Sequence, residues 1–149
     1  MKVLLFGSSL CRDLYSLDEK KIYKIEGETI EFKYSFHPGK SFEFFLNKPH
    51  LIEPILKQRG ETPDIVLVIL GGNSISTIVE PKLIFENTRK FYSLLRDKLN
   101  IVNPKAKIIA CEVPMRYIFN NFKNTPRPHI FRNIRHRVNR KLRDIKSKD

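Results

Sequence analysis

Six apolar residues in succession, at positions 65–70, restrict the possible folds of this chain more than any other segment does. A strand this apolar must be covered on both faces, as is the central strand of a parallel sheet. Apolar runs alternate along the sequence with helical patterns, which is typical of repeated β-α-β units. We therefore expect an α/β domain with a mainly parallel sheet, whose other strands come from residues 2–6, an extended stretch over 22–36, and 107–113.

Helices are expected between these strands, at residues 10–17, 41–46, 49–58 and 81–101, with a kink at Pro54. A last helix is predicted after a long loop at 114–128, with Thr125 as its cap and Pro126 at its first position. One side of this helix carries a stripe that should pack on the sheet, formed by Ile130, Ile134, Val138, Leu142 and Ile145.

Glycine-marked turns follow three of the expected strands. They read Gly7-Ser8-Ser9, His37-Pro38-Gly39-Lys40 and Gly71-Gly72-Asn73-Ser74. The carboxyl ends of parallel strands share one edge of a sheet, so turns that are far apart in the sequence can converge on a single ligand. Taken alone, the first turn is equally typical of a helix cap in which the serines make only local hydrogen bonds.

The three turns together resemble the SGNH (GDSL-type) hydrolases, whose first three sequence blocks are a Gly-Asp-Ser turn, a loop glycine and a Gly-x-Asn turn. The resemblance extends in element order from residue 1 to about residue 145. The chain is similar also to the SGNH-like domains of some animal retrotransposons and related orphan genes, in which the serine turn precedes a stretch such as Arg12-Asp13-Leu14.

This resemblance implies a three-layer, flavodoxin-like sandwich that hydrolyses a small-molecule ester. Ser9 would be the nucleophile and would also donate its N–H to the oxyanion, with Gly39 and Asn73 as the other oxyanion donors. Ser8 occupies the position where the family usually has an aspartate that holds the nucleophile turn. No cofactor and no metal is implied.

The family's fourth element, an Asp-x-x-His block that carries the general base, does not occur before the sequence stops at Asp149. We therefore expect residues 1–149 to form one SGNH-like domain that is truncated before the last strand and is weak or inactive. His129, and also His37, would have to substitute for the base; His50 and His136 are weaker candidates.

Positive charge is concentrated at the carboxyl end. Residues 116–149 contain eleven Lys and Arg and two Asp, which is nine of the net twelve charges. The alternative function is therefore a non-catalytic module that binds nucleic acid or another polyanion without sequence preference, through Arg132, Arg135, Arg140 and Lys141. A solvated helix face explains the same residues without a partner.

A second alternative is phosphate or nucleotide binding by the Gly7–Ser9 turn at a helix start, a geometry that also follows the first strand. Two cysteines suit a reducing compartment. No apolar run approaches the roughly 20 residues that a membrane span needs. We expect an intracellular, cytoplasmic protein, and the sequence does not predict an oligomeric state.

Overall fold

The computed structural model describes residues 1–149 except 19, 76–79, 114–126 and 147–149. Five strands form one sheet in the order β2-β3-β1-β4-β5. Their bounds are Lys2–Gly7 (β1), Ile22–Ile25 (β2), Glu28–Phe36 (β3), Ile65–Ile69 (β4) and Lys107–Ala110 (β5). Every neighbouring pair is parallel except β2 with β3, so the mainly parallel sheet predicted from the sequence is confirmed.

The register brings the carboxyl ends of three strands together. Gly7 at the end of β1 lies opposite Phe36 at the end of β3 and opposite Ile69 at the end of β4. The turns that follow β1, β3 and β4 therefore start at the same level on one edge of the sheet.

The stretch 22–36 is not one strand, as the sequence suggested, but a hairpin of β2 and β3. Glu26 and Gly27 turn the chain with φ of +49° and +84°. Two successive residues with positive φ make a tight turn whose twist matches that of the strands beside it, and glycine adopts this conformation at little cost. Our expectation missed the turn because only one of the two residues is a glycine.

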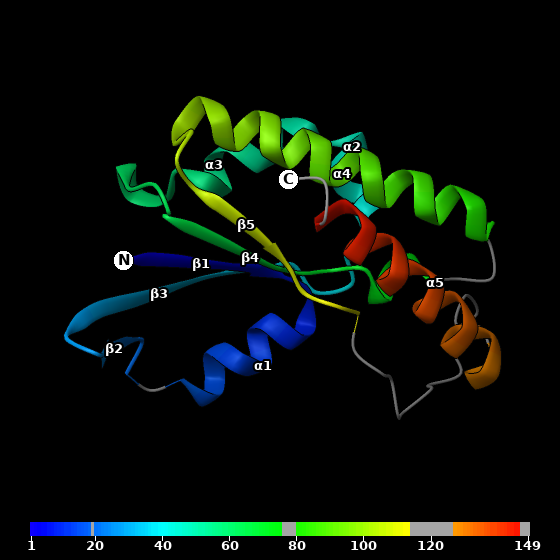
Figure 1. Ribbon diagram of the computed structural model, residues 1–149, viewed down its shortest axis with the longest axis horizontal. Coiled ribbons are helices and arrows are strands. Elements are labelled where there is room, and N and C mark those ends of the chain that lie inside the picture. The colour runs from blue at the N-terminus through cyan, green and yellow to red at the C-terminus, as the bar shows by residue number, and fades with distance from the viewer. Residues whose placement is uncertain (19, 76–79, 114–126, 147–149) are drawn as a thin grey trace.

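Helices cover both faces of the sheet, so the three-layer sandwich is also confirmed (Figure 1). On one face α1 (Ser9–Leu17) packs against β1 and β3. The other face carries a larger apolar core, contributed by α2 (Phe42–Asn47), α3 (Ile52–Leu56), α4 (Pro81–Val102) and α5 (Pro128–Lys146). No helix among the described residues is both long and apolar enough to cross a membrane.

The apolar stripe of α5 is rotated by about one residue at its start from the stripe that we expected. Ile130 is 41% exposed, whereas Phe131 is buried. Ile134, Val138 and Leu142 are buried as predicted, with Ile145 packed beside them. The larger ring of Phe131 fills the core where the expected register would have placed Ile130. Thr125, Pro126 and most of the expected loop lie outside the described residues.

Strand β4 is covered on both faces, as expected, but less completely on one of them. Val66 and Val68 are fully buried on the side of α2–α5. On the side of α1, Ile69 is buried, whereas Ile65 and Leu67 are only partly buried. The reason is that α1 lies over β1 and β3, away from β4 and β5.

Candidate active site

The three glycine-marked turns are joined to one another by hydrogen bonds. The His37 N–H donates to the Gly7 carbonyl (2.7 Å), and the Ser8 N–H donates to the carbonyl of Ile69 at the end of β4 (3.2 Å). The Asn73 side-chain amide donates from Nδ2 to the Lys40 carbonyl (3.1 Å). The turn after β1 is thus fixed to the ends of β3 and β4, and the turn after β3 is fixed to the turn after β4.

In the first turn, the backbone passes very close to β4. A Cβ atom on Gly7 would lie 2.7 Å from the Ile69 carbonyl oxygen and 2.9 Å from Cys11 Cβ, so only glycine fits here. Ser8 precedes α1 as its N-cap, but its side chain makes no capping hydrogen bond. The alternative that this turn serves only as a side-chain helix cap is therefore not supported for Ser8. Ser9 is the first residue of α1 and is exposed.

The second turn, His37-Pro38-Gly39-Lys40, is closed by a hydrogen bond from the Lys40 N–H to the His37 carbonyl (3.1 Å). Gly39 has a φ of +72°. Proline followed by a residue with positive φ is the pattern of a type II turn. The closing bond uses the N–H of Lys40 and not that of Gly39, and Gly39 is exposed. The turn therefore does not need the Gly39 N–H to close.

The third turn begins at Gly71, which has a φ of +115°. A Cβ atom there would lie 2.7 Å from Val113 Cγ2 and 3.1 Å from the Phe42 ring. Asn73 follows in a short 3₁₀ helix, Gly72–Ser74. The bond from its Nδ2 to the Lys40 carbonyl fixes the plane of the side-chain amide.

A residue that sequence reasoning missed supports this arrangement. The buried Ser74 hydroxyl accepts a hydrogen bond from the Phe42 N–H at the start of α2 (3.1 Å). It therefore ties the third turn to the helix that follows the second turn. A serine directly after the Gly-Gly-Asn turn was visible in the sequence, but nothing there indicated that its side chain turns inward.

His37 lies at the same edge, but its ring is already engaged. Nε2 is 2.8 Å from Ser35 Oγ, and the ring makes edge-to-face contacts with Phe6 and Phe45. Burial, and secondarily the charge of Lys40, lower the pKa of His37 below its ordinary value. These contacts hold the ring on the side of the sheet that α2 covers, opposite the side of α1.

His129 is exposed in the first turn of α5, which begins on the side of the molecule toward which the parallel strands point (Figure 1). The basic residues Arg132, Arg140 and Lys141 are also exposed on α5. Arg135 differs from them because it is half-buried and donates from Nη1 to the Val113 carbonyl (3.2 Å). It contributes to holding α5 against the end of β5.

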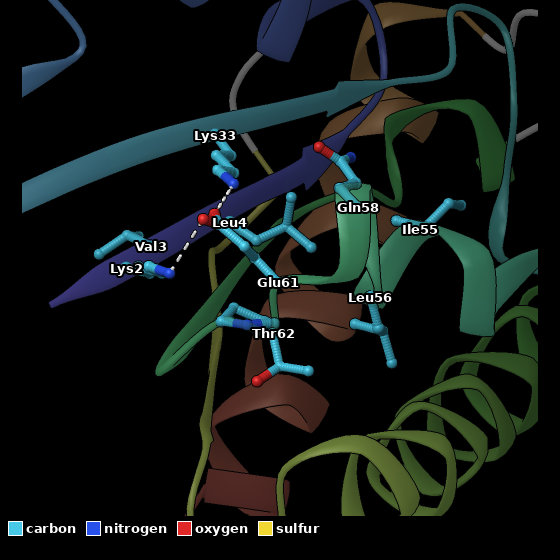
Figure 2. A pocket seen from close by; sticks show the side chains of 10 residues that line it. Lys2, Val3, Leu4, Lys33, Ile55, Leu56, Gln58, Glu61 and Thr62 are labelled. Carbon is cyan, nitrogen blue, oxygen red and sulfur yellow. Dashed lines mark hydrogen bonds and ion pairs between the residues drawn. The ribbon is translucent and has the colours of Figure 1, made fainter.

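The opposite, amino-terminal edge of the sheet is closed. Figure 2 shows Glu61 paired with both Lys2 and Lys33, between β1, β3 and the chain that enters β4. The hydrogen bond from Lys33 and then that from Lys2 hold the pKa of Glu61 below its usual range. The cavity there has a volume of about 10 Å³, which is room for about one water molecule. It does not suit an organic ligand.

A larger groove of about 770 Å³ lies elsewhere, between α4, β5 and α5. Neither this groove nor the small cavity is lined by Ser9, Gly39 or Asn73, so the three turns do not share a hollow with either. No cluster of three potential metal ligands occurs within the part of the chain that the structure describes.

Comparison with known proteins gives structural neighbours but no sequence relatives. No protein-family model matches the chain. No curated protein matches it significantly. An acetyl xylan esterase, AlAXEase, superposes with a TM-score of 0.59 at 17% identity, over 99% of this chain and 74% of the other. A lipase/acylhydrolase from Enterococcus faecalis gives 0.50 at 19% identity, over 95% and 70%. The chain therefore has the fold of SGNH-type hydrolases.

Proposed function

We propose that this chain is a serine ester hydrolase scaffold in which Ser9 takes up an acyl group. The observation that supports the proposal is the set of hydrogen bonds that joins the three turns to which Ser9, Gly39 and Asn73 belong. The two structural neighbours act on acyl esters by name, which supports an ester of a small acyl group as the substrate class.

In the proposed reaction, Ser9 Oγ attacks the ester carbonyl carbon and loses its proton to a base. The carbonyl oxygen becomes an oxyanion, which the N–H groups of Ser9 and Gly39 and the side-chain amide of Asn73 stabilise. The alcohol then leaves, and water hydrolyses the acyl-Ser9 ester. The amino end of α1 adds a favourable partial positive charge.

Activation of Ser9 is the weak part of the site. A serine hydroxyl gains little nucleophilicity unless a base lies within hydrogen-bond reach. Among the described residues, no hydrogen bond joins a histidine to Ser9, and His37 is held by Ser35. His129 remains the candidate base. We therefore expect hydrolysis of p-nitrophenyl acetate barely above background, and slow but measurable covalent labelling of Ser9 by a more reactive fluorophosphonate.

The test is labelling with the fluorophosphonate followed by peptide mapping. Ser9→Ala should abolish the adduct, whereas Ser16→Ala, an exposed serine on the same helix, should not change it. Asn73→Asp removes the oxyanion donor and should slow labelling by about 10²-fold to 10³-fold.

Two results would contradict the proposal: an adduct on a residue other than Ser9, and labelling that survives Ser9→Ala. Either would remove Ser9 from the reaction. Robust ester turnover that is lost both in Ser9→Ala and in His129→Ala would keep Ser9 as the nucleophile, assign His129 as its base, and contradict only the expectation of weak activity.

A second candidate function is binding of nucleic acid by α5. The observation that favours it is the exposure of Arg132, Arg140 and Lys141 on one helix that also begins with an exposed His129. Phosphate contacts of this kind give affinity without sequence preference. The phosphate-cradle alternative for the first turn is less favoured, because the Ser8 N–H is already bound to the Ile69 carbonyl.

A further inference from the structure

Strand β5 forms one edge of the sheet and has backbone groups that point away from it. The Lys107 N–H donates to Asp64 and the Cys111 N–H donates to Val68, both at 2.9 Å. In a parallel ladder, alternate residues direct both backbone groups to the same neighbour. Ile108 and Ala110 therefore direct theirs outward. Among the described strands, only β4 pairs with β5.

Side chains bind the backbone just before and just after strand β5. At the amino end, Arg96 donates from Nη1 to the Ala106 carbonyl (2.9 Å). At the carboxyl end, the buried Asn139 amide accepts from the Val113 N–H (2.7 Å) and donates to the Val113 carbonyl (3.1 Å). The Arg96 side chain thus occupies a position that a neighbouring strand would otherwise take, whereas Asn139 holds α5 to the chain just beyond the end of β5. The stretch between them, 107–112, spans about 20 Å, which is the length of an ordinary strand.

The groove of about 770 Å³ lies beside this edge. Its walls are α4 and α5, and β5 forms its base. Its lining carries four cationic side chains and two anionic ones, which are Arg89, Arg96, Lys107 and Lys141 against Asp97 and Asp144. The groove is therefore net positive as well as open along a strand edge.

We propose that this groove binds an extended acidic segment of another polypeptide, which adds to the sheet as a strand next to β5. The outward backbone groups of Ile108 and Ala110 supply the hydrogen bonds, as in other complexes in which a peptide extends a sheet. The cationic side chains of the groove make it prefer a segment that contains acidic residues.

The two faces of β5 determine which side chains the bound segment should carry at alternate positions. Ile108 and Ala110 belong to the core on the side of α4 and α5, whereas Ile109 is 40% exposed on the other face. Side chains of adjacent strands that lie opposite each other share a face. Acidic residues on the groove side would thus alternate with aliphatic residues that cover Ile109.

A second copy of this chain is the less suitable occupant. The chain has a net charge of +12, so two copies placed edge to edge across a net positive groove would repel each other. A small anion would use the cations but not the outward backbone groups, whose alternating donors and acceptors match an extended polypeptide.

The test uses the full chain and three capped, fluorescently labelled octapeptides. In the first, Glu and Val alternate; the second has the same composition in two blocks; the third has Lys in place of Glu. The alternating acidic peptide should bind saturably and raise the fluorescence anisotropy, whereas the Lys peptide should not bind. The block peptide should bind about tenfold more weakly, because its charges cannot all lie on one face of a strand.

Charge-reversal variants at adjacent positions of α4 provide a matched control. Arg89 lines the groove and Lys90 does not, although both are exposed. Arg89→Glu should weaken binding of the alternating peptide by about tenfold, whereas Lys90→Glu, with the same change in net charge, should have little effect.

Hydrogen exchange distinguishes strand pairing from charge attraction alone. The amides of Ile108 and Ala110 should become protected when the alternating peptide is added. Those of Lys107 and Cys111, already bonded to the chain of β4, should be protected with or without it. Equal binding of the alternating and block peptides, equal effects of the two variants, unchanged exchange at Ile108 and Ala110, or no binding would each overturn the proposal. Protection of these amides by self-association alone would overturn it in favour of a second copy.

Discussion

At the scale of single residues, one glycine in each turn is required for its own physical reason: Gly7, Gly39 and Gly71. Gly7 and Gly71 lack space, since a Cβ atom would come within 2.7 Å of the Ile69 carbonyl oxygen and of Val113 Cγ2, respectively. Around Gly39 there is open space, but its φ of +72° is one that other residues adopt only with strain. The sequence shows only that a glycine is present; which of these constraints applies depends on the packing of segments far apart in the chain.

His37 should make stability depend on pH in a defined direction. Because burial and then Lys40 lower its pKa, the unfolded chain takes up a proton below the ordinary value of 6.5 that the folded chain does not. The contribution of His37 to the free energy of unfolding is therefore full above that pH and decreases as the pH falls below it.

An NMR titration of the His37 ring measures this directly, and urea unfolding above and below pH 6.5 measures its effect. His37→Gln, which can still pair with Ser35, should reduce the loss of stability at the lower pH. A ring pKa at or above 6.5 in the folded protein would show that the ring is less buried than the structure indicates.

At the scale of elements, the sequence was sufficient for what depends on local pattern. The parallel strands and the position of the turns at their carboxyl ends followed from apolar runs that end in glycine. The hairpin of β2 and β3 could not be predicted from the sequence, because Glu26 adopts a positive φ that its residue type does not indicate. The register of α5 also needed the structure, since Ile130 and Phe131 are both apolar and only packing decides which is buried. The inward orientation of the Ser74 side chain was missed because it too is decided by packing.

One buried amide contributes strongly to the attachment of α5 to the chain that follows β5. Asn139 is 2% exposed and satisfies both backbone groups of Val113, which is itself buried. Asn139→Ala would leave the Val113 N–H without this partner, while the Val113 carbonyl would keep the bond from Arg135. An unsatisfied buried group costs about 1–3 kcal/mol, so we expect urea unfolding to show a loss of about 1–3 kcal/mol.

The matched control for this substitution is Asn133→Ala, since Asn133 is exposed on the same helix. It changes the same residue type and the same helix propensity, and should change the free energy of unfolding by less than about 0.5 kcal/mol. Equal losses in the two variants would mean that the contact of Asn139 with Val113 contributes nothing beyond helix propensity.

At the scale of the whole molecule, the candidate active site and most of the positive charge belong to different parts of the sequence. The three turns that form the candidate active site are built mainly by the amino-terminal half of the chain. Nine of the twelve net positive charges lie in residues 116–149. A ligand of the turns and a polyanion on α5 would therefore depend on different side chains, and each can be tested by its own substitutions.

Binding of polyanions by α5 should depend on its exposed cations and not on the total charge. Replacing Arg132, Arg140 and Lys141 by Gln should weaken binding to all DNA sequences about equally, because phosphate contacts carry no sequence information. The slope of log affinity against log salt should become shallower by about 0.9 for each duplex phosphate that the variant no longer neutralises. Arg135 is left in place because it bonds to Val113 and its replacement would disturb the fold.

Two controls define the result of this titration. Replacing three exposed lysines on other elements, Lys24, Lys82 and Lys90, removes the same net charge and should affect the slope less. Ser9→Ala should leave it unchanged, since Ser9 lies on α1. Measured at physiological ionic strength, equal weakening by both triple variants would assign binding to overall charge. The absence of binding to DNA and RNA under that condition would show that the exposed cations of α5 are solvated side chains that bind no polyanion.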